Sequence, residues 1–369
     1  MSDGDRAPRI LLACDFHRHY CTMLAGGLER AGAEVVLLTR DHDLEFGGVP
    51  GAAMEFTREV VGPGVTVKTL GGRVRSPRDW RRALALRREL KRFRPDVVHL
   101  QDSVGNDVRL LFAAGVHRRR FVLTVHDSAR HPGDGEFPFV ARLNRVLELG
   151  AGLIFVHAES VEQELREFIS PKLPVVVIPH GIDPGEATPL PQEPSILFFG
   201  RISYYKGLDV LLDAMEAIWG QLPAATLTIA GEGEIEPHPA LSDPRVTVHA
   251  GHVPEADVPA LFRAASCVAL PYREASQSGV GSRIKPYARP LVVAAVGGLP
   301  ELVSDGSGIV VPAEDPAALA EALVSVLADR GLATRLGEAG AATAAREGSW
   351  DTVAGETLAA YREHLVPRG

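Results

Sequence analysis

Cysteine is scarce in this chain, which argues against the fold classes held together by disulfides. The 369 residues include three cysteines, Cys14, Cys21 and Cys267, an odd number with neither a disulfide framework nor a zinc-type spacing. Cys14 and Cys267 stand in apolar runs, where cysteine packs as a small hydrophobic residue. We therefore expect a protein of a reducing compartment whose core consists of ordinary apolar side chains.

Long apolar runs are absent as well. No stretch reaches 18 consecutive apolar residues, and residues 1–8 are polar, without the apolar segment of a signal peptide. We therefore expect a soluble, cytoplasmic protein. Apolar residues still make up 46% of the chain and charged residues 23%, as in an ordinary globular protein. The length suffices for two domains with separate cores.

Positive charge is in the minority. The formal net charge of −8 argues against general nucleic-acid binding. One segment departs from this balance, because residues 73–94 hold ten Lys or Arg and only two acids, Asp79 and Glu89. Apolar side chains between Trp80 and Phe93 recur at helical spacing, which predicts an amphipathic helix with a basic outer face. A solvated face is the simpler interpretation, and weak attachment to an anionic membrane surface is the alternative.

Short apolar runs alternate with amphipathic segments along the whole chain. In the first half we expect helices near 20–31 and 76–93, and strands over 9–14, 34–39, 65–70, 95–100, 121–125, 152–156 and 175–178. In the second half we expect helices over 208–219, 256–265 and 315–328, and strands over 196–199, 227–230, 246–250, 267–270, 291–294 and 308–311. The predicted fold class is α/β, with two doubly wound, Rossmann-like domains facing a central cleft.

A polar, proline-rich stretch separates the two halves. Four prolines lie between residues 184 and 194, a composition typical of a link between domains. We therefore predict an N-terminal domain over 1–184 and a C-terminal domain over 185–349. Residues 350–369 are predicted as a helical segment that packs back on the N-terminal domain, with these apolar candidates: Val353, Leu358, Ala359 and Leu365.

The loop after the first strand of the second half is the most informative feature of the chain. An apolar run ends at Gly200, and Arg201 and Lys206 follow before a helix begins near Leu208. In an open parallel sheet, ligands bind just beyond the carboxyl ends of the strands. Two cations five residues apart, beside a helix N-terminus, suit a diphosphate. The alternative is an ordinary connection with solvated charges.

A second polar loop lies in the same half and also follows a predicted buried strand. Gly279 and Gly281 let the backbone approach a ligand closely and present N–H donors to phosphate oxygens. Glu274 can accept hydrogen bonds from two neighbouring hydroxyls of a sugar. Arg283 and Lys285 are expected to add positive charge nearby. A polar surface turn is the alternative.

At this point the chain resembles the retaining glycosyltransferases of family 4, which have the GT-B fold. The resemblance covers essentially the whole chain and is strongest in the second half. It implies a nucleotide-activated sugar as donor, a small-molecule or glycan acceptor, and no cofactor. The motifs that carry it are Pro95-Asp96-Val97-Val98-His99, Ile178-Pro179-His180-Gly181-Ile182-Asp183, Phe199-Gly200-Arg201, Lys206-Gly207-Leu208-Asp209, Ile229-Ala230-Gly231-Glu232-Gly233 and Gly297-Gly298-Leu299-Pro300-Glu301.

The resemblance implies a donor site in the C-terminal domain. Arg201 and Lys206 would hold the diphosphate, and Glu274 would contact hydroxyls of the donor sugar. Arg201, Lys206 and backbone amides near Ser278 and Gly279 would stabilise the leaving diphosphate in place of a metal. The catalytic candidates are His126, Glu274, Arg201 and Lys206. The donor-binding candidates are Gly200, Arg201, Lys206, Gly231, Glu232, Glu274, Gln277, Ser278, Gly279 and Val280.

Two segments depart from the family pattern. The second acid, which usually binds the ribose eight residues after the first, is replaced by Ser282. Tyr287-Ala288-Arg289-Pro290 replaces the usual glycine-containing turn before the proline. These departures motivate an alternative, in which the chain has the GT-B fold and binds a nucleotide or a partner but has lost transfer activity.

The N-terminal half offers candidates for the acceptor. His126 ends a predicted strand, where a histidine can hydrogen-bond a sugar hydroxyl or orient the acceptor. The resemblance places the active-site histidine of this domain there, and a structural histidine that caps the next loop is the competing interpretation. The loops at 15–20, 46–63 and 128–138 are expected to select the acceptor. The acceptor-binding candidates are Asp15, Phe16, His17, Gln101, Asp102, His126 and Asp127.

The chemistry implied by the resemblance is transfer with retention at the anomeric carbon. No pair of carboxylates suggests a glycosidase-like double displacement, which agrees with a front-face mechanism. A metal site is not expected, since Asp41-His42-Asp43 has the spacing but no supporting context. A dehydrogenase is disfavoured because Gly-x-Gly-x-x-Gly does not follow the first strand. A sugar-nucleotide epimerase of the same fold would need an acid pair that the sequence does not show.

Overall fold

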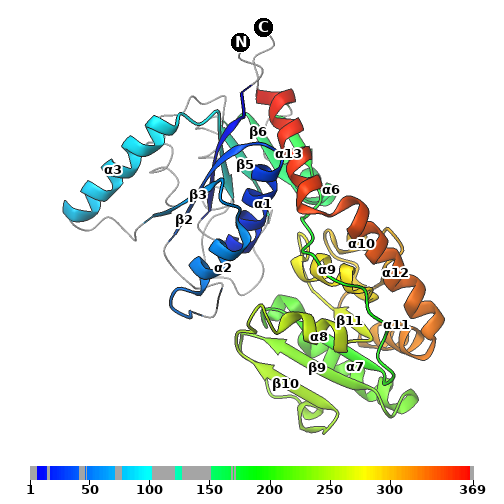
Figure 1. Ribbon diagram of the computed structural model, residues 1–369. Helices are drawn as coiled ribbons and strands as arrows, with labels where there is room; N and C mark the ends of the chain where they lie inside the picture. The colour runs from blue at the N-terminus through cyan, green and yellow to red at the C-terminus, as the bar shows by residue number, and fades with distance from the viewer. Residues whose placement is uncertain are drawn as a thin grey trace. The chain divides into compact units, whose positions relative to one another are not determined.

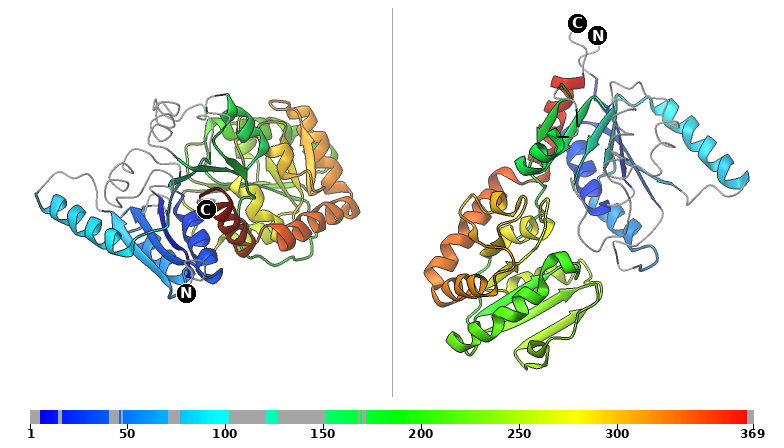
Figure 2. Two further views of the ribbon diagram at one scale, coloured as in Figure 1. Left: turned by 90° about the horizontal axis from the view of Figure 1, so that it is seen from above. Right: turned by 180° about the vertical axis from the view of Figure 1, so that it is seen from behind.

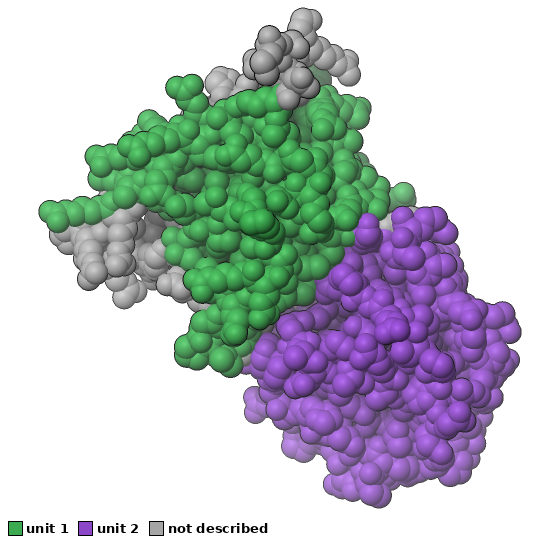
Figure 3. Space-filling model, viewed as in Figure 1, with its two compact units in different colours: residues 1–128, 137–181, 350–369 green, residues 129–136, 182–349 purple. Residues whose placement is uncertain are grey.

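The computed structural model (Figure 1) describes residues 6–14, 17–40, 46, 48–70, 77–101, 121–126, 151–167, 169 and 172–365. These residues divide into two compact units, which Figure 3 shows in separate colours. The first unit comprises the described residues before 127, residues 151–181 and the C-terminal helix from Trp350; the second comprises residues 182–349. The chain passes from one unit to the other after Gly181, where we had placed a boundary at 184.

Seven parallel strands form the sheet of the first unit, in the order β3-β2-β1-β4-β5-β6-β7. The order reverses between β1 and β4, as in a doubly wound Rossmann sheet. β1, β4, β5 and β6 are almost wholly buried, which explains their continuous apolar sequences. The strands are β1 (Arg9–Cys14), β2 (Glu34–Arg40), β3 (Val65–Leu70), β4 (Val97–Gln101), β5 (Phe121–Thr124), β6 (Leu153–Val156) and β7 (Val175–Val177).

The described helices of the first unit are α1 (Arg18–Arg30), α2 (Ala52–Val60), α3 (Pro77–Phe93), α6 (Glu159–Arg166) and α13 (Trp350–Leu365). The last of these lies beside α1 in the views of Figures 1 and 2. Gly27 permits this approach, since a Cβ there would lie 2.5 Å from the carbonyl oxygen of Trp350. Val353, Leu358 and Leu365 are buried as expected, but Ala359 is exposed, because it lies on the outer face of α13.

The basic helix α3 has the amphipathic character that its sequence predicts. Leu90 is buried, and Leu86 and Phe93 pack against the core. Arg88 and Lys91 are exposed on the other face. Attachment of this face to a membrane stays a prediction. Within the part of the chain that the structure describes, no helix combines the length and the apolar character needed to cross a membrane.

Six parallel strands form the sheet of the second unit, in the order β10-β9-β8-β11-β12-β13. The strands are β8 (Ser195–Phe199), β9 (Thr226–Gly231), β10 (Val246–Ala250), β11 (Cys267–Leu270), β12 (Leu291–Ala294) and β13 (Gly308–Val311). The helices are α7 (Leu208–Gln221), α8 (Val258–Ala264), α9 (Gly279–Ile284), α10 (Leu299–Leu302), α11 (Pro316–Ala328) and α12 (Arg330–Glu347). Here the order reverses between β8 and β11. The α/β class with two Rossmann-like units is confirmed.

Five of the described helices were not predicted, namely α2, α6, α9, α10 and α12, and three of them show why. α2 lies within 46–63, which we expected to be a loop, and its N-terminus carries Gly51 instead of a polar cap. α9 begins inside the second polar loop, where Ser278 caps it through a bond from Gly281 N–H. α12 is rich in alanine and glycine, so its apolar pattern is weak; a Cβ at its Gly337 would lie 2.1 Å from the carbonyl oxygen of Ala288. Small residues therefore let α12 pack closely without the large side chains that mark a helix in a sequence.

Candidate functional site

The connection from β8 to α7 places two cations at the carboxyl edge of the second sheet. After Gly200 the chain exposes Arg201, and a 3-10 turn over Tyr204–Lys206 leads to Gly207. Gly207 has φ 67, and a Cβ there would lie 2.0 Å from the carbonyl oxygen of Pro271. Only glycine fits this approach, which brings the loop against the connection after β11.

Two tyrosine rings orient these cations. Lys206 Nζ lies 3.8 Å from the ring centroid of Tyr272 and 5.0 Å from that of Tyr205. Arg201 donates a hydrogen bond of 3.3 Å to the Tyr205 hydroxyl. An aromatic face attracts a cation without cancelling its charge. The rings therefore restrict both side chains without themselves neutralising the charge.

Tyr272 joins this loop to α9. Its hydroxyl lies 3.2 Å from Ser278 Oγ, and Ser278 Oγ also accepts a 3.2 Å bond from Gly281 N–H. Burial raises the pKa of Tyr272 to about 12, so the phenol stays neutral. The bond corrects one expectation: the N–H of Gly281 is taken up by the helix cap and is not presented to a phosphate. The first turn of α9 and Lys206 nevertheless form one assembly through Tyr272.

The side chain of Arg273 links the connection after β11 to α7 and to the connection after β13. Its guanidinium donates to both oxygens of Asp209, at 2.8 and 2.6 Å, and to Glu314 at 2.9 Å. It also lies 4.3 Å from the ring centroid of Tyr204. The hydrogen bonds from Arg273 lower the pKa of Asp209, and the bonds with Asp209 raise the pKa of Arg273. Sequence analysis did not predict these ion pairs of Arg273, although Asp209 stands in one of the motifs.

The two further cations of this region do not add free positive charge, contrary to our expectation. Arg283 lies 3.1 Å from a carboxylate oxygen of Asp183 and 2.5 Å from one of Glu255. Lys285 is only 5% exposed, and its ammonium donates to Asp305 at 2.8 Å and to a backbone carbonyl. Their charges are therefore neutralised within the second unit.

The segments that depart from the family pattern are structural in character. Ser282 is buried, and its hydroxyl donates a long 3.5 Å bond to the carbonyl oxygen of Ser278 within α9. Arg289 is 1% exposed and donates to the carbonyl oxygens of Phe262 and Arg263, where α8 ends. A cation at a helix C-terminus is stabilised by the helix dipole. Arg289 thus serves the packing of α8.

The other donor-binding candidates lie around the same edge. Ile202 N–H donates to the carbonyl oxygen of Glu232 at 2.7 Å, which joins the β8–α7 loop to the end of β9. A Cβ on Gly200 would lie 3.1 Å from a methyl group of Val280. Glu274 is exposed and Gln277 is partly buried. The structure thus brings the β8, β9 and β11 candidates to one edge, while their individual roles stay predictions.

The carboxyl edge of the first sheet carries a cluster of rings that we call the histidine cluster. His126, at the end of β5, is 3% exposed and stacks on His17, with centroids 4.0 Å apart. Tyr20 meets His126 edge-on at 4.8 Å. Sequence analysis named His17 and His126 but not the other members of the cluster, although His157 and His180 each come shortly after a strand. The cluster consists of His17, Tyr20, His126, His157, His180 and Trp350.

Burial keeps two imidazoles of this cluster, those of His126 and His157, neutral by lowering their pKa. It lowers the pKa of His126 well below the ordinary value, and His17, His157 and His180 lower it further. Burial, and then the neighbouring His180, lower the pKa of His157 to about 3. Among the residues that the structure describes, no group of histidine, cysteine or acidic side chains is arranged to hold a metal ion. The neutral rings of His126 and His157 are suited to hydrogen bonding.

Gln101 does not line an open site as expected. It is fully buried, with its amide 2.8 Å from His126 Nε2 and 3.2 Å from His99 Nε2, so it can act only through those rings. His17 has φ 60, a conformation that is uncommon for a residue other than glycine. Four acceptor-binding candidates lie outside the described residues: Asp15, Phe16, Asp102 and Asp127.

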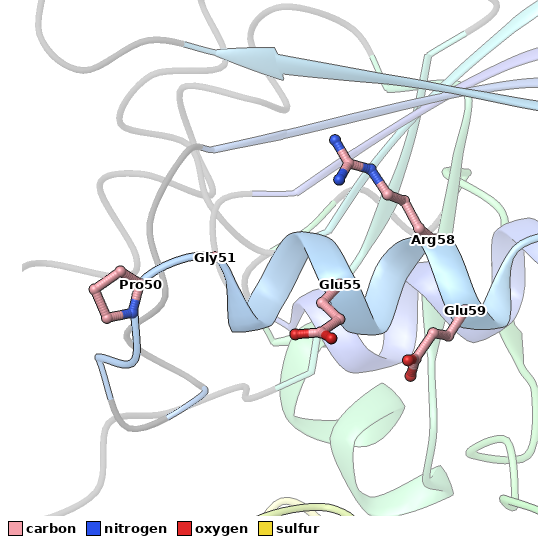
Figure 4. A pocket seen from close by; sticks show the side chains of 5 residues that line it. All are labelled: Pro50, Gly51, Glu55, Arg58 and Glu59. Atoms are coloured by element: carbon pink, nitrogen blue, oxygen red, sulfur yellow. The ribbon is translucent and has the colours of Figure 1, made fainter.

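A surface depression of about 400 Å³ lies on α2, within the segment 46–63 that we expected to select the acceptor. Figure 4 shows Glu55 and Glu59 on one side of the helix and Arg58 on the other. The remaining lining comes from Pro50 and Gly51. No candidate from either sheet edge lines it, so the depression adds no residue to the predicted site.

Comparison with known proteins identifies the family. A family model described as Glycosyltransferase Family 4 matches residues 18–186, and one described as Glycosyl transferases group 1 matches residues 193–329. A D-inositol 3-phosphate glycosyltransferase of Xylanimonas cellulosilytica is 32% identical over 67% of this chain and 66% of its own length, just under two thirds. A glycogen synthase of Mycobacterium tuberculosis is 27% identical over 89% of this chain and 80% of its own.

Solved structures share the fold. HepE of Anabaena, solved in complex with UDP, superposes with a TM-score of 0.75 over 96% of this chain and 100% of its own, at 16% identity. The same protein has also been solved with UDP-glucose. At this identity the likeness concerns the fold alone.

Proposed function

Because the chain belongs to the GT-B glycosyltransferases of the family 4 type, we propose that it moves a glycosyl group from a nucleoside diphosphate sugar to an acceptor hydroxyl, with retention and without a metal ion. The observation that carries the proposal is the pair Arg201 and Lys206 at the carboxyl edge of β8, held against Tyr205 and Tyr272. This arrangement suits two phosphate groups joined by one bridging oxygen.

In this proposal the second unit provides electrostatic stabilisation. As the bond between sugar and diphosphate breaks, negative charge develops on the leaving group. Arg201 and Lys206 stabilise that charge, together with backbone amides near Ser278 and Gly279. Glu274, which is exposed beside them in sequence, binds hydroxyls of the donor sugar. UDP and UDP-glucose bound to HepE support a nucleotide sugar as the donor.

The first unit provides hydrogen bonding to the sugar or the acceptor. His126 is neutral and buried among other rings, so it is suited to a directional hydrogen bond with a hydroxyl. His17, which directly precedes α1, stacks on it and completes this part of the proposed acceptor site. The acceptor is a small molecule or a glycan, which the inositol phosphate and glycogen named for the relatives illustrate.

A second candidate function is nucleotide binding without transfer. Ser282 favours it, because its buried side chain cannot replace the acid that usually binds the ribose. The position of Arg201 and Lys206 at the carboxyl edge of the second sheet, together with the exposed Glu274, favours transfer. The two candidates differ in an observable way, since a protein that only binds would be stabilised by UDP and would release no sugar from any UDP-sugar.

The test begins with thermal-shift screening of UDP-, GDP- and dTDP-sugars, followed by hydrolysis and transfer assays with the donor that binds. We expect Arg201→Ala and Lys206→Ala each to lower kcat by about 10²–10³-fold, because each removes a charge that stabilises the leaving group. The melting temperature should stay close to that of the wild type.

Arg245→Ala is the matched control. Arg245 also lies on an aromatic ring of the second unit, 4.0 Å from the ring centroid of Trp219, but at the start of β10. We expect full activity from this variant. Unchanged turnover in both Arg201→Ala and Lys206→Ala would contradict the diphosphate assignment. Donor binding without hydrolysis or transfer would favour the binding function instead.

A further inference from the structure

We propose that the outer side of α3 attaches the first unit to a membrane surface that contains acidic phospholipids, and that this attachment is peripheral and reversible. The inference is independent of the proposed function, because this side of α3 includes none of the predicted site residues. We call it the α3 face, and it consists of Arg81, Leu84, Arg88, Lys91 and Arg92, all of which are exposed.

Helical geometry brings the members of the α3 face together. They follow one another at intervals of three, four, three and one residues, which returns to the same side of a helix with about 3.6 residues per turn. The opposite side packs on the core of the first unit through Leu86, Leu90 and Phe93. Figures 1 and 2 show α3 at the margin of this unit. Because the core holds the helix by its apolar side, the α3 face is directed to solvent.

The α3 face is positive in a chain that is otherwise acidic. Residues 73–94 carry a net charge of +8 and the whole chain carries −8, so the remaining residues carry −16. Glu89 stands beside the face, but its carboxylate lies 2.8 Å from the ammonium of Lys68 on β3, which offsets its charge. Within the part of the chain that the structure describes, neither a hydrogen bond nor an ion pair engages the side chains of the four cations. Their charge is therefore available to an external anion.

The position of Leu84 favours a lipid surface over other polyanions. This side chain is 43% exposed although cations lie on both sides of it along the helix. A bilayer surface offers phosphate groups with acyl chains beneath them, so it accommodates the cations and the leucine together. The phosphate backbone of a nucleic acid would satisfy only the cations. The aliphatic stems of the arginine and lysine side chains add apolar contact in the same way.

The attachment is weak, because it uses charge and a single leucine. The apolar side of α3 already packs on the core of the unit, so it is not inserted into the bilayer. Each Lys or Arg close to an acidic membrane contributes about fivefold to partitioning. Screening limits these interactions to about 10 Å at about 0.1 M salt. We therefore expect binding that requires acidic lipid and is lost at high ionic strength.

The test is co-sedimentation of the full-length protein with vesicles, without donor or acceptor. Vesicles of phosphatidylcholine alone are compared with vesicles that contain about 40% phosphatidylglycerol, at about 0.05 M and about 0.5 M NaCl. In low salt we expect the partition coefficient to be about 100-fold higher with phosphatidylglycerol, and in high salt we expect this difference to disappear. Equal binding to both kinds of vesicle, or binding to neither, would overturn the proposal.

A pair of double variants locates the contact. Arg88→Gln/Lys91→Gln removes two charges from the α3 face and should lower the partition coefficient about 20-fold. Glutamine is a good helix former and both positions are exposed, so the melting temperature should stay close to that of the wild type. The matched control is Arg335→Gln/Arg362→Gln, which removes two exposed cations from α12 and α13 and should bind like the wild type. An equal loss in both double variants would reflect net charge alone and would contradict the assignment to α3.

Leu84→Gln separates a bilayer from a nucleic acid. It should weaken binding to acidic vesicles by about two- to fivefold and leave binding to a short DNA duplex unchanged, because phosphates offer no apolar contact. Tighter binding to the duplex than to acidic vesicles would assign the α3 face to nucleic acid and overturn the membrane proposal. Vesicle binding that does not respond to Leu84→Gln would also contradict a bilayer as the partner.

Failure of the proposed function would look different. Hydrolysis of a soluble nucleotide sugar is measured without vesicles, and Arg88→Gln/Lys91→Gln should hydrolyse it as the wild type does, since neither residue belongs to the proposed site. If the chain does not transfer sugars, hydrolysis will be absent from the wild type and from every variant. Binding to acidic vesicles would remain as described.

Discussion

The carboxyl edges of the two sheets carry opposite kinds of chemistry on the same topology. In the first unit, burial lowers the pKa values of His126 and His157. In the second unit, Arg201 is exposed and Lys206 lies against tyrosine faces. Both sheets reverse strand order at the same point of the pattern. The comparison shows that the fold fixes where a site can lie, while the first residues after each strand decide what it can do.

Solvent explains why the two edges differ. An exposed guanidinium or ammonium stays charged at little cost, so the second edge can attract a diphosphate. A buried imidazole loses its charge through desolvation and keeps only directional hydrogen bonds. The same rule separates two lysines of the second unit, since Lys206 is accessible whereas Lys285 is buried against Asp305.

We expect the largest effects, one on stability and one on activity, from replacing Lys285 and Lys206. Lys285→Met leaves the partly buried carboxylate of Asp305 without its cation, with the Ser307 N–H still donating to it, and should lower the free energy of unfolding by about 3 kcal/mol. Lys206→Met should leave stability nearly unchanged and remove activity. Urea unfolding and a transfer assay measure both. If Lys285→Met were as stable as Lys206→Met, the contrast between a structural and a binding cation would fail.

Lowering the pH should destabilise the first unit before it destabilises the second. His99 and His157 have pKa values lowered to about 3, so between that pH and about 6.5 the unfolded chain binds more protons than the folded one. Stability therefore falls as the pH drops below about 6.5, by about 2 kcal/mol per histidine at pH 5. Hydrogen exchange followed by mass spectrometry should show faster exchange in β5 than in β8 at pH 5. Equal changes in both strands would contradict the comparison.

A backbone position offers a smaller test of the second edge. Gly231 has φ 154, and a Cβ there would lie 1.8 Å from the carbonyl oxygen of Gly200. Gly231→Ala should lower the free energy of unfolding by about 2–3 kcal/mol and weaken donor binding, because the β8–α7 loop must shift. Gly220→Ala, in α7, meets no atom within 4 Å and should stabilise by about 0.5–1 kcal/mol. Thermal unfolding distinguishes the two; equal melting temperatures would show that the loop tolerates the shift.

The strands were the most predictable part of the molecule. β1, β11 and β12 match the predicted ranges, because a buried parallel strand is a continuous apolar run. β3, β10 and β13 also match, although they are less buried. The positions of Arg201, Lys206 and His126 at strand ends were predictable for the same reason. Helices were less so: α12 packs through small residues, and α2 lacks a polar cap. The apolar pattern of α12 is weak, whereas the amphipathic sequence of α2 could have indicated a helix.

The sequence alone determined the order of strands and helices, the two-unit organisation and the cations after β8, because each is a local pattern along the chain. Only the tertiary structure decided which charges remain accessible: it paired Arg283 and Lys285 with acids and left Arg201 exposed. It also joined Tyr361 to His99 across 262 residues. Such contacts depend on how helices and strands pack, and no spacing in a sequence encodes the distance between side chains that meet only after the sheet has formed.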